Sequence, residues 1–304
     1  MDSSPTRYRS VFAPDLFAGE TALVTGGGTG IGRCIAHELA SLGARVIVAG
    51  RRPEPLAKVV TEITDDGGQS VAWPLNIRDE DAVAQRITEL WAAHGPIRLL
   101  VNNAGGQFAS PAAAIKPKGW RAVIDTNLNG TWFVSQAVYH AGMSRAGGSI
   151  VNIVADMWNG FPGMAHTGAA RAAVVNLTQT LAIEWAPAGV RVNAVAPGFI
   201  LSSGLANYPA PVAAMARSIF TRNPSARPGT ESEVSAAVAF LLSRGAAYIT
   251  GATLRVDGAS SLRKDPLVPH VDHQRLTPYT GFHRPTDLPE TFADLAPTRG
   301  KESG

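Results

Sequence analysis

Cysteine is almost absent from this chain of 304 residues, because Cys34 is the only one. One cysteine cannot form an internal disulfide or a multi-cysteine metal cluster, so we expect no structural metal. Cys34 and His37 lie three residues apart in a helical pattern, but two side chains are too few for a metal site. We therefore interpret Cys34 as a small buried hydrophobe.

Long apolar runs and clusters of one charge are missing too. No stretch approaches the roughly 18 uninterrupted apolar residues of a membrane span, and the 27 basic and 24 acidic residues are spread along the chain. Membrane insertion and nucleic-acid binding are thereby disfavoured, and small molecules are the expected partners. Residues 1–15 hold no secretory signal and residues 302–304 no Ser-Lys-Leu address, which makes the cytoplasm the expected location.

Short apolar runs rich in β-branched residues alternate with longer helical patterns. Helical spacing is clearest in 31–42, where Ile31, Ile35, Leu39 and Leu42 share one stripe. Because the strand candidates are apolar throughout, they are typical of a parallel sheet covered on both faces. The pattern predicts an α/β, Rossmann-type doubly wound fold. Strands are expected at 21–25, 45–49, 70–74, 99–102, 149–154, 191–195 and 252–256.

Three regions differ in composition. Residues 1–17 form an N-terminal extension, residues 18–262 carry the alternating pattern as a single domain, and residues 263–304 contain six prolines and no strong period. This tail composition favours an extended segment on the body of the protein, or disorder. Partial docking is favoured by the aromatic side chains of the tail, which are Tyr279, Phe282 and Phe292.

A glycine-rich segment, Thr25-Gly26-Gly27-Gly28-Thr29-Gly30-Ile31-Gly32, follows the first predicted strand and opens a helix. Glycine lets the backbone turn tightly and approach a pyrophosphate, while the helix N-terminus offers free N–H groups and partial positive charge. In this context the pattern predicts a dinucleotide site, with a glycine-rich turn of no further role as the alternative. The expected contacts come from Gly26, Thr29, Gly30 and Ile31.

The second predicted strand ends in Gly50-Arg51-Arg52. An NAD-specific site places a carboxylate there, against the ribose 2′-hydroxyl. Two guanidinium groups suit a 2′-phosphate instead, because each can donate charge-assisted hydrogen bonds. Arg51 and Arg52 therefore favour NADP(H), and Arg51 is expected to supply most of this preference. A pair of solvated surface arginines is the alternative.

Further motifs make residues 17–262 resemble the short-chain dehydrogenase/reductase family. They are Thr25–Gly32, Asn102-Asn103-Ala104-Gly105, Asn127-Leu128-Asn129-Gly130, Arg191-Val192-Asn193 and Pro197-Gly198. The resemblance implies seven parallel strands and a homo-oligomer, frequently a tetramer. It also implies cofactor contacts from Asn103, Ala104 and Gly105, adenine contacts from Asn76 and Ile77, and nicotinamide-side contacts from Pro197, Gly198, Ile200 and Ser202.

The segment that carries the chemistry of this family departs from its usual pattern. A typical member has a serine after the fifth strand and a Tyr-x-x-x-Lys pair on the next helix, where the cation lowers the phenol pKa. Here Thr167 and Arg171 stand at the tyrosine and lysine positions, while Val154 and Ala155 replace the serine. Because an aliphatic hydroxyl is a far weaker acid than a tuned phenol, the usual alcohol–ketone chemistry is not expected.

Loop and polar motifs resemble the peroxisomal trans-2-enoyl-CoA reductase branch, which is related to the 2,4-dienoyl-CoA reductases. These motifs are Gly106-Gln107-Phe108, Ser110-Pro111-Ala112, Lys118-Gly119-Trp120, Asn127-Leu128, Gly160-Phe161-Pro162, His166-Thr167-Gly168-Ala169-Ala170-Arg171 and Glu184-Trp185-Ala186. The resemblance implies NADPH-dependent reduction of a carbon–carbon double bond conjugated to a thioester. The implied substrate is of acyl-CoA type.

This reaction makes particular demands on side chains. Hydride addition to the β-carbon leaves negative charge on the thioester oxygen, for which Thr167, Asn127 and backbone amides are candidate donors. Arg171 is expected to hold the nicotinamide ribose with its fixed fork. Asp156, after the fifth predicted strand, is the candidate proton donor to the α-carbon, and a capping or solvated Asp156 with water as the donor is the alternative. His166 is interpreted as a packed residue.

From the sequence, three functions are open. The prediction is an NADPH-dependent 2-enoyl-CoA reductase. The second is a carbonyl reductase or alcohol dehydrogenase for branched or terpenoid intermediates, in which another residue replaces the absent tyrosine. The third is a dinucleotide-binding regulatory protein without catalysis, since fold and function are only loosely tied.

Overall fold

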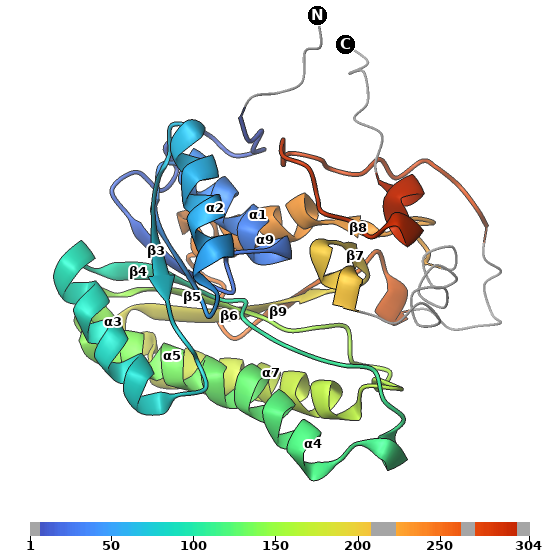
Figure 1. Ribbon diagram of the computed structural model, residues 1–304. Helices are drawn as coiled ribbons and strands as arrows, with labels where there is room; N and C mark the ends of the chain where they lie inside the picture. The colour runs from blue at the N-terminus through green and yellow to red at the C-terminus, as the bar shows by residue number, and fades with distance from the viewer. Residues whose placement is uncertain (1–6, 208–222, 263–270, 297–304) are drawn as a thin grey trace, which may run out of the picture.

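Seven parallel strands form the central sheet of the computed structural model (Figure 1). The structure describes residues 7–207, 223–262 and 271–296. The strand order is β3-β2-β1-β4-β5-β6-β9, so the chain begins near the middle, winds to one edge and crosses back to the other. The strands are β1 (Thr21–Thr25), β2 (Arg45–Gly50), β3 (Gln69–Pro74), β4 (Ile97–Asn102), β5 (Gly148–Ile153), β6 (Val190–Pro197) and β9 (Thr253–Val256). The predicted seven-stranded doubly wound sheet is confirmed.

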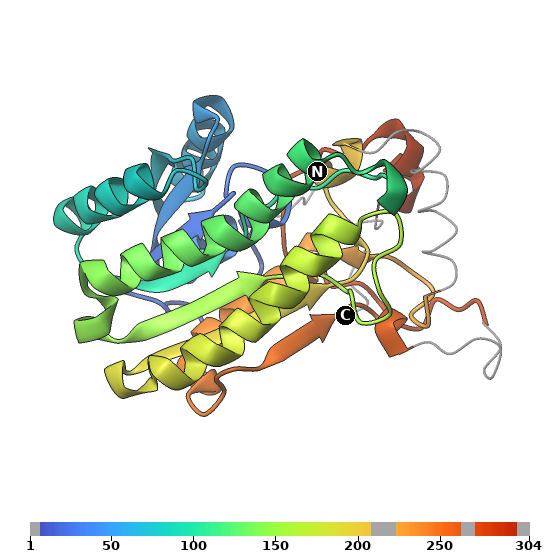
Figure 2. The same cartoon turned by 90° about the horizontal axis from the view of Figure 1, so that it is seen from below.

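Helices cover both faces of this sheet. In Figures 1 and 2, α1, α2 and α9 lie on one face, and α3, α5 and α7 lie on the other with α4 beyond them. The helices are α1 (Gly30–Ser41), α2 (Pro53–Asp65), α3 (Glu80–His94), α4 (Pro117–Ile124), α5 (Gly130–Val138), α6 (Ser144–Ala146), α7 (Ala165–Glu184) and α9 (Glu231–Leu242). Within the described ranges, no helix is both long and apolar enough to cross a membrane.

The apolar strands supply two cores, one on each face. Successive side chains of a strand point to opposite faces. Val46 and Val48 of β2 therefore join the core under α1, α2 and α9, while Ile47 and Ala49 join the core over α3, α5 and α7. This explains why the strands are continuous apolar runs. Cys34 is fully buried, which confirms its interpretation as a small hydrophobe.

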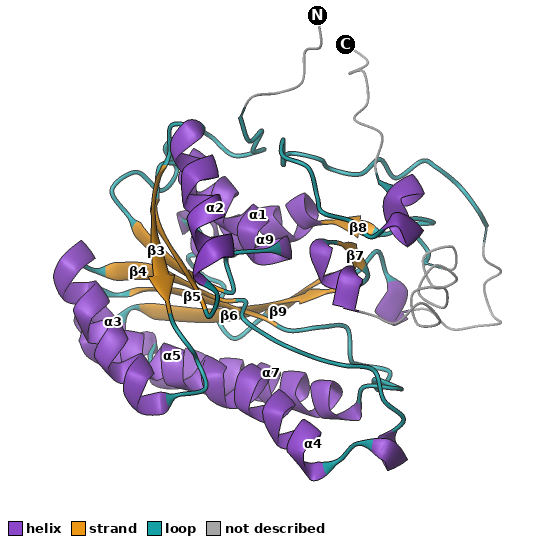
Figure 3. Cartoon of the chain, in the orientation of Figure 1, coloured by secondary structure: helices purple, strands orange, loops and turns teal. Residues whose placement is uncertain are grey.

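A short second sheet lies near the carboxyl edge of the main one. Strands β7 (Ile200–Leu201) and β8 (Gly229–Thr230) pair in parallel and connect the end of β6 to the start of α9 (Figure 3). Thr230 caps α9, because its hydroxyl accepts the N–H of Glu233 and the Glu233 carboxylate accepts the N–H of Thr230. This capping fixes the start of α9 directly after β8.

The C-terminal segment 271–296 packs along the α1–α2–α9 face. Phe282 packs with Tyr8 and Cys34, and the Arg33 guanidinium lies 5.0 Å from the centroid of the Phe282 ring. Phe292 is fully buried in a separate cluster beside β7. The predicted partial docking of the tail aromatics therefore holds for this segment, which runs in red across Figure 1.

One face of α7 stays open to solvent. Val174 and Leu181 are buried against the sheet, whereas Ile183 is 77% exposed. An exposed isoleucine on a mostly apolar helix fits contact with another subunit. The expected homo-oligomer therefore stays a prediction.

Candidate active site

The glycine loop between β1 and α1 has no room for side chains. Gly26 has a φ of +63°, and a Cβ there would lie 2.8 Å from the Cα of Ala104. A Cβ on Gly32 would overlap the carbonyl oxygen of Gly26. Thr29 is the N-cap residue of α1 and its side chain makes no cap hydrogen bond, which leaves backbone N–H groups of the first turn available to an anion. The loop therefore fits the pyrophosphate of a dinucleotide.

Asn103 connects the loop after β4 to this glycine loop. Its side-chain amide donates to the backbone oxygens of Thr25 and Gly26, both at 3.1 Å. The Thr25 hydroxyl accepts the N–H groups of Asn103 and Ala104 at 3.1 Å. These hydrogen bonds hold Ala104 and Gly105 next to the glycine loop, where the cofactor is expected to bind. Asn103 thus positions the glycine loop through its side-chain amide.

Arg171 lies at the centre of the site. Its Nη1 donates to the backbone oxygen of Ile153 at 2.6 Å, at the end of β5. A Cβ on Gly105 would overlap Nη2, so the absence of a side chain there makes room for the guanidinium. Burial lowers the pKa of Arg171 to about 10, and the group is still cationic at neutral pH. A fixed charge thus lies between β5 and the loop after β4.

Asn127 shapes the same loop from a π-helical turn, Asp125–Asn129. Its amide nitrogen donates to the backbone oxygens of Gly106 at 2.7 Å and Val123 at 2.8 Å, and its Oδ1 accepts the Gly106 N–H at 3.3 Å. Both amide hydrogens are therefore used inside the protein. In this arrangement Asn127 positions the loop, which differs from its expected direct donation to the substrate oxygen.

Thr167 and His166 lie in the first turn of α7, and both are fully buried. The Thr167 N–H donates to His166 Nδ1 at 2.8 Å, and the Thr167 hydroxyl lies 3.2 Å from the same nitrogen. The imidazole also packs at 4.4 Å between centroids against Phe108, which agrees with the interpretation of His166 as packed. Its Nε2 nevertheless has no hydrogen-bond partner among the described residues.

Asp156 is half-buried just after β5. Its Oδ2 accepts the hydroxyl of Ser260 at 2.8 Å, and its N–H donates to the Pro197 oxygen at 3.1 Å. The neighbouring Trp158 is 37% exposed and packs against Arg255, whose guanidinium carbon is 4.0 Å from the ring centroid. The Asp156 side chain therefore lies where the strands of the sheet end. One of its oxygens accepts a hydrogen bond from Ser260, and few apolar side chains shield it from solvent.

The remaining predicted cofactor residues divide into two groups. Asn76 is exposed after β3, whereas the Ile77 side chain is buried against Gly130, so only the backbone of Ile77 is available to a ligand. On the other side, Ser202 follows β7, and its Cβ is 3.9 Å from the position of a Cβ on Gly30. The structure also brings Pro197, Gly198 and Ile200 to this edge, where β6 ends and β7 begins.

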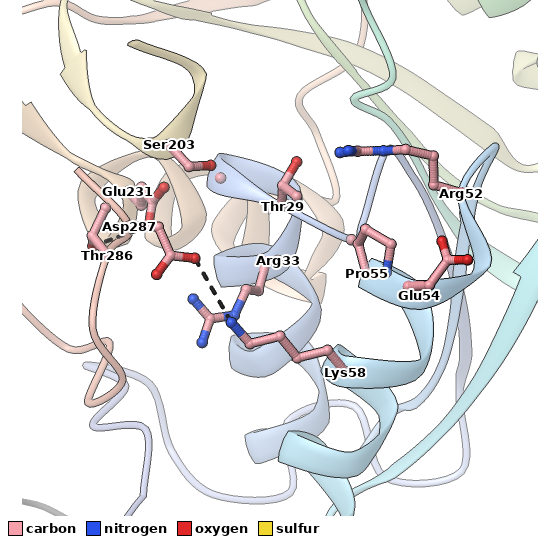
Figure 4. Close-up of a pocket in the computed structure, with 12 residues that line it drawn as sticks. Thr29, Arg33, Arg52, Glu54, Pro55, Lys58, Ser203, Glu231, Thr286 and Asp287 are labelled. Carbon is pink, nitrogen blue, oxygen red and sulfur yellow. Dashed lines mark hydrogen bonds and ion pairs between the residues drawn. The ribbon is translucent and has the colours of Figure 1, made fainter. Parts of the chain in front are cut away.

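A cavity of about 370 Å³ opens beside the glycine loop (Figure 4). It is lined by the loop, by the start of α2, by the start of α9 and by the C-terminal segment. Arg52 lines this cavity, whereas Arg51, the arginine expected to contribute more, is not among its lining residues. The lining residues are Gly28, Thr29, Gly30, Arg33, Arg52, Glu54, Pro55, Lys58, Ser203, Glu231, Thr286 and Asp287.

Sequence reasoning missed Glu231, which is only 4% exposed at the wall of this cavity. Its Oε2 accepts the Thr286 hydroxyl at 3.4 Å, and Oε1 has no partner among the described residues. Burial raises the pKa of Glu231 to about 7. The only sequence signal was an acid in the first turn of a helix, which reads as favourable charge near a helix N-terminus.

Comparisons with known proteins agree on the family and differ on the substrate. A family model described as enoyl-(acyl carrier protein) reductase matches residues 26–260. A probable 2,4-dienoyl-CoA reductase of Bacillus subtilis is 39% identical over 251 residues, covering 81% of this chain and 98% of the relative. The citronellol catabolism dehydrogenase AtuB of Pseudomonas aeruginosa PAO1 is a similar solved structure, with 50% identity, a TM-score of 0.76, and coverage of 84% of this chain and 100% of that one.

A third relative bears on the cofactor. The structure of a putative NAD(P)-dependent gluconate 5-dehydrogenase from Beutenbergia cavernae, described with bound NADP, is 37% identical with a TM-score of 0.76. It covers 83% of this chain and 100% of that chain. The fold, the glycine loop and these matches together support an oxidoreductase that uses a nicotinamide dinucleotide. The chain belongs to the short-chain dehydrogenase/reductase family.

Proposed function

We propose that the protein is an NADPH-dependent reductase of the 2,3 double bond of an enoyl-CoA thioester. The observation that carries this proposal is the pair Thr167 and Arg171 at the start of α7. A buried aliphatic hydroxyl with a fixed cation one turn away can orient a polar group, but it cannot supply the acidic proton that a carbonyl reduction needs.

No other phenol in the described part of the chain takes that place. Tyr8 packs with Cys34, Tyr139 stacks on Trp185, Tyr248 is fully exposed, and the Tyr279 hydroxyl donates to the Arg9 oxygen. Tyr208 lies outside the described residues. The described site is therefore better suited to a reaction whose main demand is stabilisation of an enolate.

Each site residue has a role in this proposal. When bound, NADPH supplies a hydride to the β-carbon of the substrate. Arg171 provides a fixed charge beside the ribose, and Asn127 holds the Gly106 backbone, whose shape fixes the wall of the site. Thr167 orients the thioester oxygen, and Asp156 donates or relays the proton to the α-carbon.

The cofactor preference belongs to the same proposal. Arg52 faces the cavity beside Thr29, and no carboxylate follows β2 directly where a 2′-hydroxyl would need one. The related gluconate 5-dehydrogenase described with NADP supports the preference. We infer that NADP(H) binds more tightly than NAD(H).

The similarity to AtuB favours a second candidate. That protein, at 50% identity, is named as a citronellol catabolism dehydrogenase, which makes oxidoreduction of a branched terpenoid intermediate the alternative function. The two functions differ in the group that is reduced, a carbon–carbon double bond or a carbonyl. They also differ in the need for a phenol-type acid.

A substrate panel separates these candidates. NADPH oxidation is measured with straight and branched 2-enoyl-CoA thioesters, the free acids, and the matching aldehydes and ketones. We expect turnover of the thioesters and negligible turnover of the carbonyl compounds. Rapid carbonyl reduction or alcohol oxidation would support the second candidate, and binding of NADPH without any turnover would support a regulatory protein.

Reduction rates and NADPH affinity test Asp156. Asp156→Asn is expected to lower thioester reduction by about 10²–10⁴-fold and to leave NADPH affinity intact. Ser260→Ala serves as the matched control, because it removes the hydrogen bond to Oδ2 and keeps the carboxyl. Equal reduction rates for Asp156→Asn and the wild type would assign the proton to water or to His166.

A further inference from the structure

The cavity beside the glycine loop has a wall that comes from the far end of the chain. Thr286 and Asp287 line it opposite Arg52 and Lys58 (Figure 4). Lys58 on α2 forms an ion pair with Asp287 at 3.7 Å, which Figure 4 draws as a dashed line between the two side chains. The two side chains are 57% and 69% exposed, so the pair lies at the solvent side of the cavity.

The backbone around Asp287 is held by contacts that do not involve Lys58. Arg33 donates to the Pro285 oxygen at 3.0 Å, and Thr286 donates to Glu231. Arg284, three residues before Asp287, forms an ion pair with Asp66 at the end of α2. Asp287 is therefore presented to the cavity by a docked segment, and its carboxylate is kept within reach of Lys58.

The cations that line the cavity are not equally available to a ligand. Arg33 is committed, because its Nε and Nη2 both donate to the Glu62 carboxylate at 2.8 Å. Arg52 has no ion-pair partner among the described residues, and Lys58 is paired only with Asp287 there. Lys58 and Arg52 are thus the two lining cations that an anion could recruit.

We propose that Lys58 is a second recognition residue for the 2′-phosphate of NADP(H), and that Asp287 competes with this phosphate for the Lys58 ammonium group. The inference rests on the NADP(H) preference proposed above. A phosphate monoester carries up to two negative charges and three acceptor oxygens, whereas the carboxylate carries one charge. In NADH the 2′ position is a neutral hydroxyl, which leaves the ion pair between Lys58 and Asp287 undisturbed.

The other acidic groups of the wall define the electrostatic setting. Glu54 stands at the first turn of α2, and Glu231 approaches from the start of α9. Burial raises the pKa of Glu231 to about 7, so this carboxyl is only partly charged near neutrality and opposes an anion weakly. Asp287 is 69% exposed, so solvent screens its direct repulsion of a phosphate, and its removal is expected to help the phosphorylated cofactor by freeing the Lys58 ammonium group.

Binding measurements on the intact protein test the proposal without any turnover. Dissociation constants for NADPH and NADH are measured by cofactor fluorescence for the wild type, Lys58→Ala, Asp287→Asn and the double variant. Lys58→Ala is expected to weaken NADPH binding by about fivefold to tenfold, the scale of one partly exposed charge-assisted contact, and to leave NADH unchanged. Asp287→Asn is expected to tighten NADPH binding by about twofold to fivefold, again without an effect on NADH.

The double variant provides the sharpest outcome. If Asp287 acts only by occupying Lys58, the double variant binds NADPH as weakly as Lys58→Ala does, and the tightening disappears. Matched controls are Lys118→Ala on α4 and Asp272→Asn, two exposed charges that do not line the cavity.

Several results would overturn the proposal. They are an unchanged NADPH constant in Lys58→Ala, an equal effect of Asp287→Asn on both cofactors, and a tightening that persists in the double variant. A wild-type preference for NADPH combined with any of these would leave the proposed cofactor intact and reject the role of Lys58 and Asp287. Equal wild-type constants for NADPH and NADH would reject both, and none of these results depends on enoyl-CoA turnover.

Discussion

The glycine loop and the start of α7 lie at the same edge of the sheet but are built by different means. The loop works through the absence of side chains, since a Cβ on Gly26 or Gly32 would meet neighbouring backbone. The start of α7 works through side chains, since Arg171 reaches Ile153 and Thr167 lies against His166. Substitutions in the loop should therefore fail by collision, and substitutions on α7 should change the chemistry while the fold persists.

Gly32→Ala gives the largest expected effect. The added methyl group would collide with the Gly26 backbone oxygen inside the glycine loop. This collision is expected to abolish measurable binding of NADPH and NADH, and to lower the free energy of unfolding by about 1–3 kcal/mol. Calorimetric titration measures the binding, and urea unfolding measures the stability. Gly67→Ala is a useful control because nothing lies within 4 Å of its Cβ position, although its φ of +83° adds local strain. Normal cofactor affinity in Gly32→Ala would contradict the steric account of the loop.

Arg171→Ala tests the start of α7, which is built from side-chain contacts. Loss of the cation that we propose to lie beside the ribose is expected to reduce turnover by about 10²–10³-fold, because a preorganised charge is removed from the site. Arg171→Lys keeps a cation and one donor for the Ile153 oxygen, and it should retain substantial activity. Steady-state kinetics and circular dichroism are measured together. Equal losses in Ala and Lys variants would show that the guanidinium geometry matters more than its charge.

Glu231→Gln concerns the wall where α9 meets the loop, and its effect is a pH dependence of stability. Burial raises the pKa of Glu231 from 4.5 to about 7, so the folded state holds a proton that the unfolded state releases between those values. Wild-type stability is thus expected to fall as pH rises from about 4.5 to 7, by about 3 kcal/mol in total. The glutamine variant lacks this loss.

The comparison is made by urea unfolding at pH 5 and pH 8. Glu231→Gln should gain stability relative to the wild type at pH 8 and differ little at pH 5. Glu184→Gln, which replaces an exposed carboxyl at the end of α7, is the matched control and should show no such change. A constant difference between Glu231→Gln and the wild type at both pH values would mean that the carboxyl is ionised in the folded protein throughout.

Arg52→Ala and Arg51→Ala should give the smallest effects and separate the two arginines. Arg52 lines the cavity, so its removal is expected to weaken NADPH binding by about tenfold, which is about 1.4 kcal/mol, with little change for NADH. Arg51, which is exposed outside the lining, should contribute less. Fluorescence titration of both variants with both cofactors checks the order. A larger loss in Arg51→Ala would move the 2′-phosphate away from the cavity.

Sequence and structure agree best where local chemistry dominates. All seven strands of the main sheet were predicted, and their ends differ from the observed ones by no more than two residues. The glycine loop was predicted as well, because both features depend on neighbours in the sequence. Apolar runs specify strands buried on both faces, and glycines between a strand and a helix specify a tight turn at a helix N-terminus.

The sequence identified candidate site residues, whereas only the structure shows which contacts these residues make. Asn127 was expected to face the substrate, but its amide hydrogens bind Gly106 and Val123. Arg51 was expected to supply most of the preference for NADP(H), and only Arg52 lines the cavity. Each of these outcomes depends on which distant segment supplies the hydrogen-bond partner or the wall, and residue spacing along one segment does not contain that information.

The sequence by itself determined the parallel sheet and the glycine loop. It also showed that Thr167 stands where the family usually has a tyrosine, because each of these features follows from residue types at fixed local spacing. Only the tertiary structure decided that Glu231 is buried beside the loop and that Asp287 reaches Lys58. Burial and ion pairing between residues more than 200 positions apart depend on how helices and the tail pack on the sheet. That packing sums many weak apolar contacts over the whole chain, and no single motif encodes it.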